Sequence, residues 1–314
     1  MTDTLATGSE TYAWNSNWAK LPDGVQLGYT HGVAVDRQGL VHVFNQSRHG
    51  VLTFDGDGNF VRTWAEFPSD RFLGAHGLTL VDHDGVEHLW LTDQNSGEVV
   101  KTTLAGETVL SIDKPDHPAY AEGGNYVPTW AAESPTNGDI YVADGYGSSL
   151  VHRYDRTGQY LVTLDGSTGG GRFACPHAVW IGARPQATGV DAPVLYVTDR
   201  GNSRVQVYHL DGRFIKAFEQ QHPCCFDQHA DGRLLVPDLH AFINIYDERD
   251  QLVAEHLGDN RTIVGKHGWP NVPHAMREPG KFNSPHGGCF DRAGNIYIVE
   301  WIEDGRITKL TRQR

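Results

Sequence analysis

One strand pattern occurs six times along the 314 residues, and this repeat constrains the fold more than any other feature. The copies are VHVFNQ at 41–46, LWLTDQ at 89–94, IYVADG at 140–145, LYVTDR at 195–200, LLVPDL at 234–239 and IYIVEW at 296–301. Each copy is followed by a second hairpin, such as VLTFDGDGNFVRTW, in which alternating residues flank a turn. A unit of about 40 to 50 residues with four strands is a propeller blade. The repeat therefore predicts an all-β fold, a six-bladed β-propeller.

The two ends of the chain indicate how the ring closes. The sixth copy stops at ITKLTRQR, just after its third strand, so its fourth strand must come from elsewhere. The segment ETYAWNSNWA near the N-terminus is free to supply it, and such closure removes an open sheet edge. We therefore expect a single propeller domain over residues 1–314. The 36 Gly and 15 Pro are then explained as residues of the hairpin turns.

Charge and composition argue against several partners. The chain has 26 Lys and Arg against 39 Asp and Glu, a net charge of −13, so an anionic nucleic acid or membrane would be repelled. No stretch approaches the roughly 18 apolar residues of a membrane-spanning helix, and the N-terminus lacks a basic segment followed by an apolar run. The four Cys are too few for a disulfide framework. We expect free thiols, a cytoplasmic location and a small-molecule substrate.

Histidine is frequent, with 17 residues, and several recur at one position of the repeat. In a propeller the residue that enters the first strand of each blade lies near one mouth of the axis. Alignment of the copies on their turns places there His31, His76, Thr129, His177, Cys224 and His286. Convergent imidazoles suit zinc or another divalent transition metal. The alternative is that each His only satisfies backbone groups in a narrow channel; Cys224 is expected to be a small buried residue.

The blade pattern resembles that of NHL-repeat propellers, a family that includes binding modules and enzymes. Four blades are also similar to the catalytic domain of the peptidyl-α-hydroxyglycine α-amidating lyases. The matching segments are GAHGLTLVD, VPTWAAESPTNGDIYVADGYGSS, CPHAVWIG with LYVTDRGNSRVQVY, and SPHGGCFD with IYIVE. This resemblance implies zinc ligation by His76, His177 and His286. It also implies that Tyr146 is the catalytic base and Arg200 the site arginine.

The chemistry implied by the resemblance is cleavage of a carbinolamide. Zinc binds the substrate hydroxyl, a tyrosinate takes its proton, and the C–N bond breaks to give an amide and a carbonyl product. Two simpler interpretations stay open: Tyr146 could be an aromatic residue packed at a blade edge, and Arg200 could form an inter-blade salt bridge to a neighbouring Asp.

The chain departs from the lyase pattern at four positions. Gly287 follows the last His where the family has an Asp, which argues against the family's structural calcium. Gln46 stands where the family has a substrate-binding arginine, with Arg48 two residues away as the candidate replacement. Ser284 replaces a Met. His31 is an additional imidazole, either a fourth ligand or a proton carrier. These departures concern the peptide substrate more than the metal.

The preferred hypothesis is thus a metal-dependent lyase acting on a small hydroxylated substrate at the channel mouth. A hydrolase, hydratase or isomerase at the same metal is the alternative within enzymes. A non-enzymatic NHL interaction module is the alternative outside them. The segment 257–283, which carries His267, Trp269 and His274, is expected to be either an ordered cap or a solvated surface loop.

Overall fold

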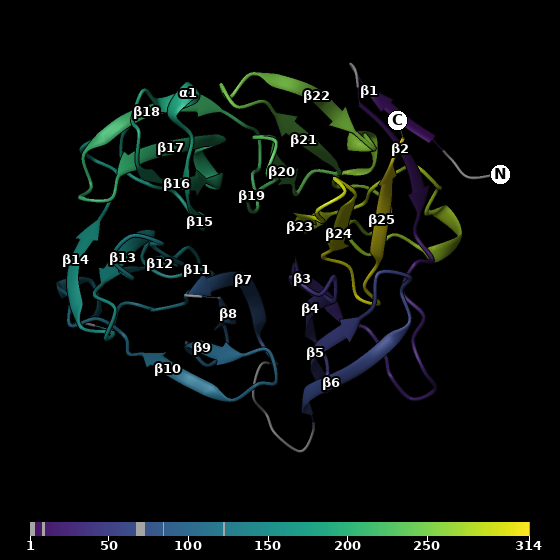
Figure 1. The fold of residues 1–314 in the computed structure, drawn as a ribbon, viewed down its shortest axis with the longest axis horizontal. Helices are drawn as coiled ribbons and strands as arrows, with labels where there is room; N and C mark the ends of the chain where they lie inside the picture. The colour runs from purple at the N-terminus through teal and green to yellow at the C-terminus, as the bar shows by residue number, and fades with distance from the viewer. Residues whose placement is uncertain (1–3, 8–9, 67–72, 84, 122, 314) are drawn as a thin grey trace. The chain divides into compact units, whose positions relative to one another are not determined.

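A computed structural model describes residues 4–7, 10–66, 73–83, 85–121 and 123–313. The protein is a six-bladed β-propeller, as predicted, and each blade is an antiparallel sheet (Figure 1). The chain divides into two compact units. Unit 1 comprises Met1–Asp70 with Phe226–Arg314, and unit 2 comprises Arg71–Cys225. Each unit contains three blades.

Unit 2 holds blades 2, 3 and 4. Blade 2 consists of β7 (Ala75–His83), β8 (Val86–Asp93), β9 (Val99–Thr103) and β10 (Thr108–Ile112). Blade 3 consists of β11 (Trp130–Glu133), β12 (Ile140–Asp144), β13 (Leu150–Tyr154) and β14 (Tyr160–Leu164). Blade 4 consists of β15 (Pro176–Ala183), β16 (Pro193–Asp199), β17 (Arg204–His209) and β18 (Phe214–Glu219). Short helices are η1 (Pro118–Tyr120), α1 (Pro185–Thr188) and η2 (Arg200–Asn202).

Unit 1 holds blades 1, 5 and 6. Blade 1 consists of β3 (Tyr29–Val35), β4 (Val41–Gln46), β5 (His49–Phe54) and β6 (Phe60–Glu66). Blade 5 consists of β19 (Asp227–Gln228), β20 (Leu234–Asp238), β21 (Phe242–Tyr246) and β22 (Leu252–Leu257). Blade 6 contains β23 (Pro285–Phe290), β24 (Ile296–Glu300) and β25 (Ile307–Arg312). Between β22 and β23 lie η3 (Arg261–Ile263) and η4 (His274–Met276).

The N-terminal segment completes blade 6. Strand β2 (Glu10–Asn15) pairs antiparallel with β25, with Trp14 opposite Leu310, so the purple β2 lies beside the yellow β25 in Figure 1. This confirms the predicted closure. A further strand that was not predicted, β1 (Thr4–Thr7), pairs with β2 and makes this sheet five-stranded.

The six repeated sequence segments are the second strands of the blades, β4, β8, β12, β16, β20 and β24. Their side chains are almost all buried, on both faces of the sheet. In unit 2, for example, Tyr141 packs in one cluster with Val197 and Tyr208 of the next blade. Burial on both faces explains why these segments are continuous apolar runs rather than alternating ones.

The hairpin between the third and fourth strands repeats one turn design. In blade 3 the Asp155 carboxylate accepts hydrogen bonds from the amides of Thr157 and Gln159, and Gly158 adopts φ 86°. A left-handed residue is needed there, which favours glycine. In blade 5 Asp250 takes the position with φ 56°. Asp and Gly therefore fix the hairpin register together.

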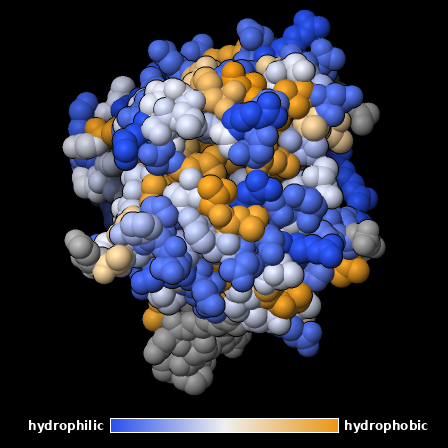
Figure 2. Space-filling model, turned by 90° about the vertical axis from the view of Figure 1, so that its left-hand side faces the viewer, coloured by the Kyte–Doolittle hydropathy of each residue, from blue (hydrophilic) through white to orange (hydrophobic). Residues whose placement is uncertain are grey.

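The outer strands carry exposed apolar side chains, among them Val109 in β10 and Leu161 and Val162 in β14. Figure 2 faces the left-hand side of Figure 1, and there hydrophobic groups are interspersed among hydrophilic ones. No helix within the described part of the chain is long and apolar enough to cross a membrane.

Candidate functional site

The residues predicted at the channel mouth lie at the start of a first strand or up to three residues before it, and all are buried. His76 and His177 are the second residues of β7 and β15, and Thr129 directly precedes β11. In unit 1, His31 lies in β3 and His286 is the second residue of β23. Exposure is 0 to 2% for all five and for Cys224. The repeat alignment therefore found equivalent positions of the fold.

A polar residue at the end of each of five second strands holds the segment that leads into the first strand of the same blade. Its side-chain oxygen accepts a hydrogen bond from a backbone N–H two or three residues before the axial position. The pairs are Asn45 with Gly28, Asp93 with Gly74, Asp144 with Val127, Asp199 with Ala174 and Glu300 with Asn283, at 2.6–2.8 Å. The acid in the repeated motif thus positions the residue at the mouth.

The ring nitrogens of three histidines show one arrangement. Nδ1 of His76 lies 2.7 Å from the carbonyl oxygen of Thr129, and Nδ1 of His177 lies 2.7 Å from that of Cys224. In unit 1, Nδ1 of His286 lies 3.0 Å from the carbonyl oxygen of His31. A carbonyl can only accept, so each Nδ1 carries the proton and each neutral ring has its lone pair on Nε2. This is the tautomer of a metal-ligating histidine held by its outer partner.

Tyr146 lies against His76 and His177 of unit 2. Its hydroxyl oxygen is 3.1 Å from Nε2 of His76 and 3.1 Å from Nε2 of His177, and the two imidazole rings are 4.8 Å apart. Because both Nε2 atoms are acceptors, the single phenol proton can serve only one of them at a time. A cation that takes electron pairs from both nitrogens would suit this group of donors.

Arg200 approaches the same hydroxyl. Its Nη2 donates to the Tyr146 oxygen at 3.2 Å and contacts the Cys175 sulfur at 3.4 Å, and its guanidinium lies over the Tyr146 ring. Cys175 has a left-handed backbone, φ 53°, and its carbonyl accepts from the Arg200 amide. Within the described residues of unit 2, Arg200 thus contacts Tyr146 and the Cys175 segment.

The electrostatics of Tyr146 reflect a buried hydroxyl on a partly exposed ring. The residue is 39% exposed, but its oxygen lies between two buried imidazoles. Burial raises the pKa of the Tyr146 hydroxyl to about 12, while the Arg200 guanidinium acts in the opposite direction. Burial also raises the pKa of the Cys175 thiol, again against the influence of Arg200. Both groups are therefore protonated at neutral pH in the absence of further positive charge.

Two glycines bring the Tyr146 segment close to its neighbours. A Cβ on Gly145 would lie 2.6 Å from Oγ1 of Thr129, and one on Gly147 would lie 2.1 Å from Oδ1 of Asp144. Side chains at either position would push the segment away. The sequence DGYG at 144–147 therefore allows Tyr146 to reach the two histidines.

In unit 1, His31 and His286 have their rings 4.5 Å apart, edge to face. Gly287 is tightly enclosed, because a Cβ there would lie 2.3 Å from the carbonyl oxygen of His31. An Asp side chain does not fit this position, and the residues present do not suit the calcium of the resembling family. Arg48 is exposed in the turn between β4 and β5. The structure thus groups Tyr146, Arg200, His76 and His177 within unit 2, and His31 with His286 within unit 1.

The long segment before β23 is largely solvent-exposed, and several of its side chains are anchored to the blades of unit 1. The Trp269 indole donates to the Asn283 carbonyl at 2.8 Å, and the Asn271 side chain bonds Tyr29 and the Glu303 amide at 2.8 Å each. His267 and His274 are exposed. Trp269 is therefore attached to the segment that leads directly into His286.

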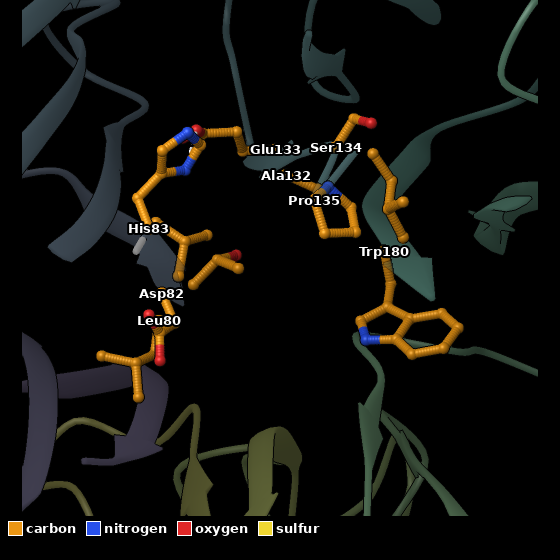
Figure 3. Close-up of a pocket in the computed structure, with 11 residues that line it drawn as sticks. Leu80, Asp82, His83, Ala132, Glu133, Ser134, Pro135 and Trp180 are labelled. Atoms are coloured by element: carbon orange, nitrogen blue, oxygen red, sulfur yellow. Dashed lines mark ion pairs between the residues drawn. The ribbon is translucent and has the colours of Figure 1, made fainter. Parts of the chain in front are cut away.

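A cavity of about 250 Å³ in unit 2 opens at the other end of the first strands (Figure 3). Its walls include Leu80, Ala132, Pro135 and Trp180, and His83 pairs with Glu133 at 3.1 Å. Glu133 also accepts from Lys101 and the Trp90 indole. The Glu133 carboxylate in this wall is therefore already paired with neighbouring donors.

Sequence reasoning missed three contributors to the site: Cys175, Asp144 and Tyr120, whose hydroxyl donates to Asp144 at 2.7 Å. The acid near the end of five of the six repeated motifs, replaced by Asn45 in the first, was visible in the sequence and could have indicated a backbone partner. Nothing in the spacing of Tyr120 connects it with the site.

Comparisons with known proteins find similarity to NHL-repeat proteins and to amidating lyases. Human NHL repeat-containing protein 3 is 28% identical over 72% of this chain and 66% of its own length. The peptidyl-α-hydroxyglycine α-amidating lyase 1 of Drosophila melanogaster is 24% identical over 94% of this chain and 59% of its own length. The homologues therefore include both groups, which confirms the resemblance noted in the sequence.

The chain spans less than two thirds of the length of these relatives. No protein-family model matches it. Among solved structures, one described as a streptogramin B lyase has a TM-score of 0.63 and 12% identity, covering 96% of this chain and 98% of its own. At that identity the likeness supports the fold.

Proposed function

We propose that this protein is a zinc-dependent lyase that cleaves a small carbinolamide. His76, His177 and His286 are the zinc ligands, with His31 as a fourth ligand or proton carrier. The observation that carries the proposal is the shared tautomer of the three histidines, each fixed by an Nδ1–H to carbonyl hydrogen bond. The named relationship to amidating lyases supports the same reaction class.

The donor set fits zinc or another divalent transition metal better than it fits calcium. Neutral imidazole nitrogens are ligands of zinc and of other divalent transition metals, whereas calcium requires oxygen. When bound, zinc supplies positive charge that lowers the pKa of a substrate hydroxyl. Each proposed ligand is buried and held by a backbone carbonyl, which limits rotation of the ring.

Tyr146 is the proposed base. As a phenolate, which the positive charge of a bound metal and of Arg200 would favour, Tyr146 accepts the proton of the substrate hydroxyl as the carbonyl forms, and the electron pair of the breaking C–N bond goes to the amide nitrogen. The same proton then passes from Tyr146 to that nitrogen, so an N-acyl-α-hydroxyglycine yields a primary amide and glyoxylate. Arg200 stabilises the phenolate through its contact at 3.2 Å.

Arg200 and Arg48 are the proposed partners of anionic groups on the substrate. Arg200 has a second Nη atom beyond the one that bonds Tyr146, and Arg48 is exposed. With a net charge of −13, we expect neither nucleic acid nor an anionic membrane as partner. The four free cysteines are compatible with a reducing compartment, and we propose the cytoplasm.

The test combines elemental analysis with turnover of an N-acyl-α-hydroxyglycine. We expect about one zinc per chain, lost in each of His76→Ala, His177→Ala and His286→Ala. His152→Ala is the matched control for zinc content, because His152 is equally buried in unit 2 but is not a proposed ligand. Protein that carries no transition metal after purification and after incubation with zinc would refute the proposal and favour the interaction module. Zinc binding with hydrolysis but no C–N cleavage would favour the hydrolase.

A further inference from the structure

Blade 3 contains a buried chain of hydrogen bonds that ends beside the Tyr146 segment. Tyr160 and Thr163 share a hydrogen bond of 2.7 Å, and Oγ1 of Thr163 lies 2.8 Å from Nδ1 of His152. Nε2 of His152 lies 2.6 Å from the hydroxyl of Tyr120, which donates to Oδ2 of Asp144 at 2.7 Å. His152 and Asp144 are 0% exposed and Tyr120 is 8% exposed.

The direction of this chain follows from its last member. The Tyr120 hydroxyl donates its only proton to Asp144. Nε2 of His152 must therefore carry a proton and donate to the Tyr120 oxygen. Nδ1 of neutral His152 then accepts from the Thr163 hydroxyl. Thr163 in turn accepts from Tyr160. Every donor points towards Asp144, an arrangement in which successive hydrogen bonds strengthen one another.

Asp144 uses this anchor to hold two segments together. Its oxygens accept from the amide of Val127 at 2.7 Å and from the amide of Ser148 at 2.6 Å. The Tyr146 amide donates to the Val127 carbonyl at 3.4 Å. Tyr146 therefore lies within a loop whose start, end and neighbouring segment all converge on one carboxylate.

Blade 4 shows a different solution at the equivalent position. Asp199 receives the charged Nε of Arg204 at 2.6 Å, with further donors from Asn202 and Gln206. In blade 3 the neutral hydroxyl of Tyr120 takes the place of such donors, and it comes from a separate segment that contains η1. In blade 4 a nearby arginine is enough to hold the carboxylate in place. The use in blade 3 of Tyr120, which is 24 residues from Asp144 in the sequence, therefore calls for another reason.

We propose that Tyr120 is a positioning residue for Tyr146, acting through Asp144 to fix the phenol between His76 and His177. The expected effect on turnover rests on the proposed function, whereas the expected effect on the loop does not. Tyr120 acts through its hydrogen bond to Asp144, by restricting where the 144–149 loop lies.

The experiment compares Tyr120→Phe with Tyr208→Phe. Tyr208 is a matched control, because it is a fully buried tyrosine of unit 2 whose hydroxyl donates to Gln206 in blade 4. Two quantities are measured on the full chain: hydrogen exchange of the 145–149 amides by mass spectrometry, and kcat and KM for an N-acyl-α-hydroxyglycine. Zinc content and thermal midpoint are recorded for both variants.

In Tyr120→Phe we expect at least about tenfold faster exchange across 145–149 and a kcat about tenfold lower, with KM within about twofold and zinc retained. Tyr208→Phe should change neither exchange at 145–149 nor kcat. Unchanged exchange in Tyr120→Phe, or an equal loss of kcat in Tyr208→Phe, would overturn the proposal. If the wild type does not turn over the substrate, the proposed function fails, while the exchange comparison still decides whether Tyr120 holds the loop.

Discussion

Two groups of buried histidines lie in unit 2, and they differ in which ring nitrogen carries the proton. His76 and His177 direct Nδ1–H at backbone carbonyls and present Nε2 to Tyr146. His152 presents Nδ1 to the Thr163 hydroxyl and donates from Nε2 towards Tyr120 and Asp144. All three are 0% exposed. Burial therefore does not distinguish a candidate ligand from a structural histidine, whereas the hydrogen-bond partners do.

The difference arises from what stands opposite each ring. A carbonyl can only accept, so it leaves a lone pair on the far nitrogen. A chain of hydroxyls that ends at a carboxylate consumes both nitrogens and leaves none for a metal. The first arrangement suits an exchangeable ligand, and the second suits a fixed support.

The sharpest way to test the first group is Tyr146→Phe, which removes the hydroxyl that both Nε2 atoms face. We expect turnover of an N-acyl-α-hydroxyglycine to fall by about 10²- to 10⁴-fold, the usual contribution of a general base. Zinc content should stay at the wild-type level, because the imidazoles keep their carbonyl partners. Steady-state kinetics with elemental analysis provide the measurement. Full turnover in a zinc-loaded variant would remove Tyr146 from the mechanism.

Sequence reasoning reached the blades and the axial positions because both follow from periodicity. The second strands are apolar runs, and equivalent residues of a repeat occupy equivalent places, so His76 and His177 could be aligned without coordinates. The tautomers could not be predicted, because their partners are the Thr129 and Cys224 carbonyls of other blades. Tyr120 was missed for the same reason: its contact with Asp144 spans 24 residues and no pattern encodes it.

The second group can be tested through its response to acid. Burial lowers the pKa of His152 to about 3, against about 6.5 when unfolded. Below pH 6.5 the unfolded chain binds a proton that the folded chain does not, so stability is lost as pH falls from 6.5 towards 3. Between pH 7 and 4.5 this loss is about 2 to 3 kcal/mol for one such group.

Replacement of His152 by Gln should remove this contribution, so His152→Gln should lose less stability between pH 7 and 4.5 than the wild type does. Urea unfolding at the two pH values measures the difference. The exposed His274 supplies the control, since His274→Gln should keep the wild-type acid response. Equal losses in the wild type and His152→Gln would show that His152 is not the buried neutral group described above.

The smallest effect is expected in unit 1, for a change beside His286. Nδ1 of His286 bonds the His31 carbonyl, just as Nδ1 of His76 bonds the Thr129 carbonyl. A Cβ at Gly287 would lie 2.3 Å from that same carbonyl oxygen, so Gly287→Ala must displace it. We expect a loss of about 1 to 3 kcal/mol in unfolding free energy from overpacking. We also expect a 10- to 100-fold weaker zinc affinity, the usual cost of disturbing a ligand's outer partner.

Chelator competition and urea unfolding measure the two effects, with Gly56→Ala as control because its nearest neighbour would be 4.0 Å away. A lower free energy of unfolding with unchanged zinc affinity would mean that the carbonyl partner does not govern ligation by His286. The difference in hydrogen-bond partners between the two groups of histidines would then describe their structure but not their ability to bind metal.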